Sequence, residues 1–242
     1  MPRSSFKANS IMKKLLLIIS GTLFLTPAFA QNAFQGFYGQ IATGYENNSI
    51  SNTSLTMGPD PINFPGGNNP SNGSAPIIAG LGYNHSVSSN FLLGLGVDYS
   101  FITSNVGTAS INPSVQPNTG TTFKVSNRLN IFVTPSYVIS ADKLAYGKLG
   151  YSTQTISAAY WDNVDGQCNG NSMGSGRANG FILGGGYKQI IAGGLYGFGE
   201  ANYYKYGNTS MSKSTLCDTT TIYNLNPSSS AYNFLVGLGY KF

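Results

Sequence analysis

Apolar and polar side chains alternate with a period of two residues in eight segments of this chain. In the last segment, Phe234, Val236, Leu238, Tyr240 and Phe242 share one face, and small or charged residues share the other. Successive side chains of a β-strand point to opposite faces, so this period predicts strands with one apolar face. The other seven segments lie at about residues 37–46, 77–84, 93–101, 128–137, 145–154, 181–188 and 195–206.

The connections between these segments alternate in length. Three are short turns, near residues 86–90, 140–143 and 189–193. The four long ones are rich in Asn, Ser, Thr, Gly and Pro, which is the composition of solvated loops. They lie at residues 47–75, 103–122, 157–179 and 207–230. Short periplasmic turns and long external loops are typical of outer-membrane barrels. The sequence therefore predicts an all-β fold, an eight-stranded antiparallel up-and-down transmembrane β-barrel with both termini periplasmic.

A secreted β-sandwich is the alternative, because it also needs alternating strands separated by turns. In a sandwich, however, the outer face of each strand is polar, whereas here leucines and aromatic residues lie on the face of every strand that would be exterior. Aromatic residues near strand ends favour the barrel, because such residues form girdles at the two membrane interfaces. They are Tyr45, Tyr83, Tyr99, Tyr137, Tyr151, Tyr187, Tyr203 and Tyr240.

The first thirty residues have the order of a secretory signal peptide. A basic start at Met12-Lys13-Lys14 is followed by an apolar run to Leu25 and by Ala28-Phe29-Ala30. The apolar run has about half of the ~20 residues that a spanning helix needs, which disfavours an uncleaved anchor. We expect residues 1–30 to be a signal peptide cleaved after Ala30, with the natural start possibly at Met12, and residues 31–242 to form the barrel domain.

Removal of this peptide changes the charge of the chain. The formal net charge is +5, with 13 basic and 8 acidic residues, but four basic residues and no acidic one precede Ala30. The mature chain then carries 9 minus 8, or +1, so nothing supports a nucleic-acid partner. Charged residues make up 9% of the chain, where about a quarter is usual for soluble domains. An exported chain this poor in charge fits a membrane barrel.

Several charged residues fall on the face predicted to line the barrel. The interior of an eight-stranded barrel is only wide enough for its own side chains, and buried charges must be paired. A paired polar cluster in the lumen is therefore expected; a narrow or gated conduction path, plugged by Glu200 with Lys148 or Lys188, is the alternative. The candidates are Glu46, Asp98, Arg128, Lys148, Lys188, Glu200 and Lys241.

The remaining candidates for chemistry are few. Cys168 and Cys217 fall in the third and fourth long loops, and export to an oxidising compartment predicts one disulfide between them. No metal site is expected, because two cysteines without nearby histidines do not complete a ligand set. No cofactor and no catalytic residue are predicted either. The single histidine, His85, falls at a short turn. Pro135 lies inside the fourth strand, where its missing N–H predicts a bulge or local irregularity.

With these residues in place, the chain resembles the small outer-membrane barrels of the OmpA transmembrane-domain, OmpX and opacity-protein type. The resemblance covers about residues 34–242 and rests on the Gly-aromatic strands, on Glu200, and on the ending Gly237-Leu238-Gly239-Tyr240-Lys241-Phe242. It implies that Phe234, Val236, Leu238, Tyr240 and Phe242 form the signal read by the barrel-assembly machinery.

The resemblance also implies a non-enzymatic role in adhesion, as a surface antigen or in envelope integrity, with outer-membrane lipid and lipopolysaccharide as surroundings. An extracellular ligand would bind the long loops, where binding is usually placed. A narrow porin-like channel is the alternative function. A lipid A-modifying enzyme is a third one, but such enzymes use histidine near the outer leaflet, and His85 falls at the opposite end.

Overall fold

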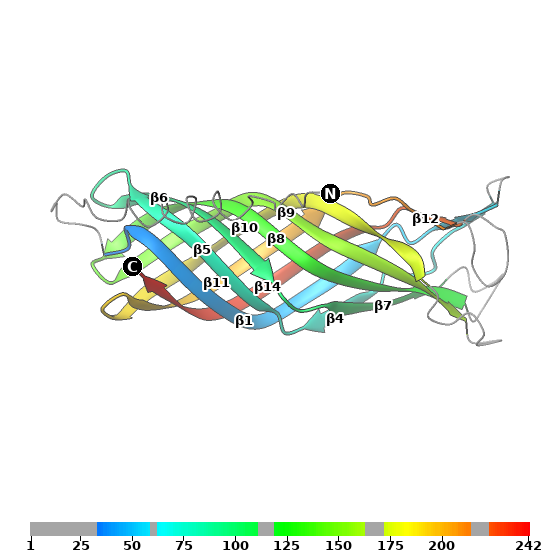
Figure 1. Cartoon of the computed structure of the whole chain (residues 1–242), viewed down its shortest axis with the longest axis horizontal. Helices are drawn as coiled ribbons and strands as arrows, with labels where there is room; N and C mark the ends of the chain where they lie inside the picture. Colours follow the sequence, from blue (N-terminus) through cyan, green and yellow to red (C-terminus); the bar gives the residue numbers. More distant parts are fainter. Residues whose placement is uncertain (1–32, 59–61, 111–118, 163–171, 214–222) are drawn as a thin grey trace, which may run out of the picture. The chain divides into compact units, whose positions relative to one another are not determined.

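Eight antiparallel strands form a closed ring in this computed structural model, which describes residues 33–58, 62–110, 119–162, 172–213 and 223–242. Each strand pairs with its neighbours in sequence, and the last pairs with the first, which closes the ring (Figure 1). The strands are β1 Gly36–Ser51, β5 Ile77–Ser86, β6 Phe91–Ser100, β8 Thr119–Ser140, β9 Lys143–Asp162, β10 Ser172–Ala192, β11 Leu195–Tyr206 and β14 Ser228–Lys241. The predicted eight-stranded up-and-down barrel is confirmed, with all eight segments in their predicted order.

The ring closes along the whole of its first strand. The pairing of β1 with β14 runs from Tyr38 opposite Lys241 to Ser51 opposite Ser228. Beyond it, the backbone N–H of Phe242 donates to the carbonyl of Phe37 at 2.9 Å. Closure matters because an open sheet edge would leave backbone groups unpaired in an apolar environment.

The two ends of the barrel differ. At one, which we call the turn end, residues 87–90, 141–142 and 193–194 connect the strands, and Gly193 has the positive φ of +55° that favours glycine in a tight turn. This end also holds the start of β1 and the end of β14. The first two short turns lie where predicted, and the third lies at 193–194 instead of 189–193, because β10 continues to Ala192. The opposite end, the loop end, carries the long connections.

The prediction that the long connections are solvated loops is wrong in part. Strands β8, β9 and β10 have 22, 20 and 21 residues, about twice the 9–11 residues that cross a membrane, so the wall continues into the predicted loops. Two further strands extend it: β4 Ser71–Ser74 pairs with β1, and β7 Ser104–Ser110 pairs with β8. The sequence analysis did not predict these strands, because in them Thr and Ser alternate with only a few apolar residues.

A second, small sheet lies at the loop end. Its order is β12 Met211–Lys213, β13 Tyr223–Leu225, β2 Leu55–Met57 and β3 Ile62–Phe64, so the first and fourth long connections build it together. In the register, one cross-strand row is apolar and the next row is polar. The apolar row is Met211, Leu225, Leu55 and Phe64, and the polar row is Ser212, Asn224, Thr56 and Asn63.

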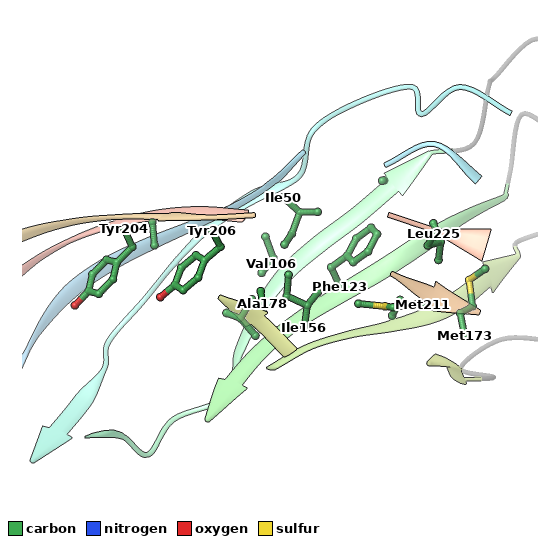
Figure 2. Close-up of a cluster of buried hydrophobic side chains, with 14 of the residues drawn as sticks. Ile50, Val106, Phe123, Ile156, Met173, Ala178, Tyr204, Tyr206, Met211 and Leu225 are labelled. Atoms are coloured by element: carbon green, nitrogen blue, oxygen red, sulfur yellow. The ribbon is translucent and has the colours of Figure 1, made fainter. Parts of the chain in front are cut away.

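The apolar row of this sheet closes a buried core at the loop end. Figure 2 shows Val106, Phe123 and Ile156 meeting between the strands, with Met211, Leu225 and Met173 beyond them. These side chains are almost fully buried. Burial of this much apolar surface stabilises the extended part of the wall.

The outward face of the ring is apolar. Exposed side chains on it include Leu81, at 63% of its full exposure, and Val236, at 64%. Aromatic residues lie at both margins: Phe37 packs on Tyr83 with ring centroids 4.8 Å apart near the turn end, and Tyr45 lies 6.3 Å from Tyr232 towards the loop end. Of the eight predicted girdle tyrosines, seven are exposed; Tyr99 is half-buried and donates to Asn127.

Of the bulge or local irregularity predicted at Pro135, the structure shows a local irregularity and no bulge. Pairing of β8 with β9 stops after Val133 and resumes at Ser136 in the same register, so the proline only interrupts that ladder, while Leu93 of β6 still faces Pro135. A bulge lies instead at Asn127, which has φ +51° and sits where the register shifts between Ser126 and Leu129. Asparagine tolerates this left-handed conformation better than most residues.

The chain divides into two units, residues 1–31 and 32–242. The predicted signal peptide lies outside the described residues, so its cleavage stays a prediction. No helix in the described ranges is both long and apolar enough to cross a membrane.

Candidate functional site

Charged side chains from six strands lie in the barrel interior. Arg128 of β8 pairs with Glu46 of β1, and both are buried. The guanidinium also donates to Gln154 at 2.9 Å and to Asn48 at 2.7 Å, and it lies 4.6 Å from the ring centre of Tyr204. A buried arginine with this many partners holds opposite walls of the barrel together.

Lys148 of β9 is the centre of a second cluster. Its ammonium lies 2.8 Å from Asp98 of β6 and 2.9 Å from Glu200 of β11, so one cation bridges two carboxylates. The Tyr146 hydroxyl donates to Glu200 at 2.7 Å, and the Asn202 amide donates to the same carboxylate at 2.8 Å. Each carboxylate therefore has both a counter-charge and a neutral donor, which for Asp98 is the side-chain amide of Asn130, as burial requires.

Lys188 lies in different surroundings from those predicted. It makes no salt bridge within the described residues; its ammonium donates to Gln40 at 3.3 Å and lies 4.2 Å from the ring centre of Tyr38 and 5.0 Å from that of Tyr196. Aromatic faces attract a desolvated ammonium. Of the two lysines predicted to face Glu200, Lys148 does so and Lys188 does not.

The prediction for Lys241 needs a larger correction. This side chain is half-buried at the end of β14, next to the turn end, and forms no ion pair with any described residue. Lys241 alternates with Tyr240 and Phe242, so its side chain belongs to the inward face of β14. It is the last residue of the strand, however, and lies at the rim of the barrel. The structure brings the other six candidates together in the interior and leaves Lys241 at the rim.

Aromatic and apolar side chains fill the lumen on both sides of the charges. Towards the turn end lie Tyr38, Tyr196 and Phe198, followed by a cluster of Phe34, Leu92, Leu144 and Tyr146. Towards the loop end, Tyr206 shares a hydrogen bond of 2.7 Å with Ser152, and the apolar core follows. A cavity beside Arg128 and Glu46 has a volume of only about 10 Å³, which is space for about one water.

Inward glycines make room for the aromatic rings. A Cβ on Gly96 would lie 2.6 Å from the Phe132 ring, and one on Gly237 would lie 2.5 Å from Phe198. The sequence showed the glycines but not their partners, because the residue paired with each glycine on the adjacent strand depends on the register. The alternation of apolar and polar residues identified the polar cluster. No pattern in the sequence identified the aromatic side chains on either side of it.

The other predicted sites are placed as follows. Cys168 and Cys217 lie outside the described residues, so the disulfide stays a prediction. His85 is exposed at the turn end. Among the described residues no group of three or more His, Cys, Asp or Glu side chains is arranged to hold a metal ion. The final face points outward, and its side chains are all exposed: Phe234, Val236, Leu238, Tyr240 and Phe242. Its role as an assembly signal stays a prediction.

Comparison with known proteins gives relatives in structure alone. No protein-family model and no curated protein sequence matches the chain. Among solved structures, the outer membrane protease OmpT of Escherichia coli is 11% identical, with 90% of this chain and 99% of that chain covered and a TM-score of 0.49. The outer membrane protein OprG of Pseudomonas aeruginosa is 12% identical, with 86% and 96% covered and a TM-score of 0.49.

The attachment invasion locus protein Ail of Yersinia pestis is 14% identical, with 86% of this chain and 99% of that chain covered and a TM-score of 0.42. These are proteins to which the chain is similar at low identity; the eight-stranded barrel itself is established by the strand pairing.

Proposed function

We propose that this protein is a bacterial outer-membrane barrel that acts as a closed, non-enzymatic scaffold and presents its loop end outside the cell for surface interaction. The observation that carries the proposal is the contrast between its two ends. The turn end has minimal connections, while the loop end carries an extended wall, a dedicated apolar core and a covering sheet.

The apolar outer face supports a membrane location. A soluble barrel would not expose Leu81, Leu95 and Val236 at more than half of their surface, because water would be in contact with them all. In an outer membrane the same side chains contact lipid between two aromatic margins. With export directed by the predicted signal peptide, the proposal assigns the short turns to the periplasm, as is typical of outer-membrane barrels.

The filled interior supports a scaffold over a channel. A channel needs a continuous polar path, whereas here apolar and aromatic layers lie on both sides of the ion pairs. Opening a path past Lys148 would separate it from Asp98 and Glu200, leaving buried charges unpaired.

Conductance separates these two functions. Refolded protein in a planar bilayer should give no stable single-channel steps, and Glu200→Gln should behave in the same way. Regular steps in the wild type that change in size or gating in Glu200→Gln would show that the barrel conducts.

We place the interaction surface on the small sheet at the loop end, formed by β12, β13, β2 and β3, because its polar row faces away from the apolar core. Asn63→Ala together with Ser212→Ala removes polar groups from two exposed positions of that row. Cells expressing this variant should attach to surfaces less than wild-type cells, at equal surface amounts of protein. If attachment of the variant is unchanged, and a strain that lacks the protein takes up more dye through its envelope, a role in envelope integrity is favoured instead.

The non-enzymatic part of the proposal has its own test. Lipid A from cells with and without the protein should give the same mass spectrum. A change in its acyl chains that depends on the protein would establish an enzyme.

A further inference from the structure

Three exposed cations lie on the outer wall of the barrel, directly beyond the apolar band on the loop side. Lys205 follows Tyr203 by two residues on β11, Arg177 precedes Phe181 by four on β10, and Lys124 lies on the extended part of β8. All three point outward, because the alternate residues Val125, Ala178 and Tyr204 are buried. Lys205 and Arg177 lie beyond exposed aromatic residues of their own strands, and Lys124 lies on the loop side of the exposed Ile131 of β8.

These cations have no acidic partners among the side chains that the structure describes. Glu46, Asp98 and Glu200 are inside the barrel, and Asp142 is in a turn at the opposite end. Salt bridges within the described ranges do not include the three cations. The outer wall here is therefore positive, although the mature chain is nearly neutral.

Arg177 is held in place on this wall. Its Nε donates to the Thr153 hydroxyl at 2.9 Å, and that hydroxyl donates to the Asn179 side-chain oxygen at 3.0 Å. The hydrogen bonds within the described residues use only the Nε of Arg177, so its two terminal nitrogens are left for a phosphate group, whose oxygens a planar guanidinium binds in pairs. Cross-strand neighbours Thr155 and Ser157 are small and polar, so a bulky headgroup has access to the wall.

We propose that Lys124, Arg177 and Lys205 form a binding site for the phosphate groups of a glycolipid in the outer leaflet. The inference rests on the membrane orientation given in the proposed function. Position favours a lipid over a soluble anion. Aromatic margins lie at headgroup level, and Lys205 and Arg177 lie one and two pairs of residues further out than Tyr203 and Phe181, which places them beside headgroup phosphates.

The test uses the complete mature protein, refolded in detergent micelles, and lipopolysaccharide with intact lipid A phosphates as the probe. The variant Lys124→Gln/Arg177→Gln/Lys205→Gln should bind it at least about tenfold more weakly, since each cation near a charged surface contributes to attraction. Wild-type binding should weaken as salt is added, because exposed charges are screened. Lys143→Gln/Lys241→Gln, at the turn end, is the control and should bind like the wild type.

Two further probes identify the source of the phosphate. Dephosphorylated lipopolysaccharide should bind wild type and triple variant equally. Full competition by inorganic phosphate at millimolar concentration would show a site for free anions and overturn the lipid assignment, as would equal binding of intact lipopolysaccharide by the triple variant. Heat-dependent gel migration shows whether each variant is folded. Single-channel recordings of each variant test the scaffold proposal separately, so failure of one proposal can be told from failure of the other.

Discussion

At the scale of single residues, the interior depends on cations that each satisfy more than one partner. Lys148 bridges Asp98 and Glu200, and its ammonium also lies 4.1 Å from the ring centre of Phe132. A buried ion pair adds little over an apolar core, but removal of one partner leaves a charge without compensation. Lys148 is thus the position at which a single change has the largest electrostatic consequence.

We predict that Lys148→Met destabilises the barrel by about 3–5 kcal/mol, because two buried carboxylates lose their counter-charge. Urea unfolding from lipid vesicles measures this. The triple variant Lys148→Met/Asp98→Asn/Glu200→Gln should recover most of the loss, since it removes the unpaired charges as well. Lys143→Met, near a turn, is the control; an equal loss there would contradict the electrostatic explanation.

A second residue-scale prediction concerns the turn at residues 141–142, outside the membrane. The Ser140 hydroxyl donates to the Asp142 carboxylate at 2.7 Å and lowers the pKa of Asp142 below its ordinary value. Asp142 therefore contributes stability above its unfolded pKa and loses it as the pH falls through the lower folded pKa. Ser140→Ala should raise this pKa towards about 3.9. Titration by NMR in micelles checks it; an unchanged pKa would show that the hydrogen bond does not form.

At the scale of elements, the bulge at Asn127 decides which residues of β8 face inward. Phe123 and Val125 are buried at odd positions, whereas Arg128, Asn130 and Phe132 are buried at even ones. One extra residue between the two parts reverses the phase, so that apolar residues fill the loop-end core and polar ones face the ion pairs. A regular strand could satisfy only one of these two requirements.

Deletion of Asn127 should therefore prevent correct folding, because either Arg128 or Val125 would turn outward. The readout is loss of heat-dependent gel migration after refolding. Asn127→Gly is the matched control, since glycine adopts the positive φ without cost. Normal migration of the deletion variant would show that the wall accommodates a shift of register here.

At the scale of the whole molecule, the barrel is a filled cylinder whose membrane band and loop end are stabilised by different means. The band has lipid outside and ion pairs inside, whereas the loop end has its apolar side chains inside, under the small sheet. An interior so fully packed predicts high resistance to unfolding by detergent.

We predict that membrane-extracted protein migrates faster on a gel before boiling than after it, because a closed barrel stays folded in detergent until heated. The comparison is made on the same sample with and without boiling. Absence of a shift, together with recovery of the protein in the soluble periplasmic fraction, would contradict the membrane barrel.

The sequence by itself determined the eight strands, their order, the short turns and the inward phase of the charged residues, because a period of two is a local property of each strand. The final face ending at Phe242 is one example: its five side chains are all exposed, as alternation requires. The sequence also located six charges that meet in the interior.

Only the tertiary structure decided the partners and the extent of the wall. That Lys148 and not Lys188 contacts Glu200 depends on the registers of β9, β10 and β11, which no local pattern contains. Strands of Ser, Thr and scattered apolar residues continue into predicted loops because paired neighbours and a shared core stabilise them there. The bulge at Asn127 reverses the alternation, which a single period of two cannot represent. Local sequence patterns therefore determine the strands, whereas pairing between distant strands determines which charged side chains meet in the interior.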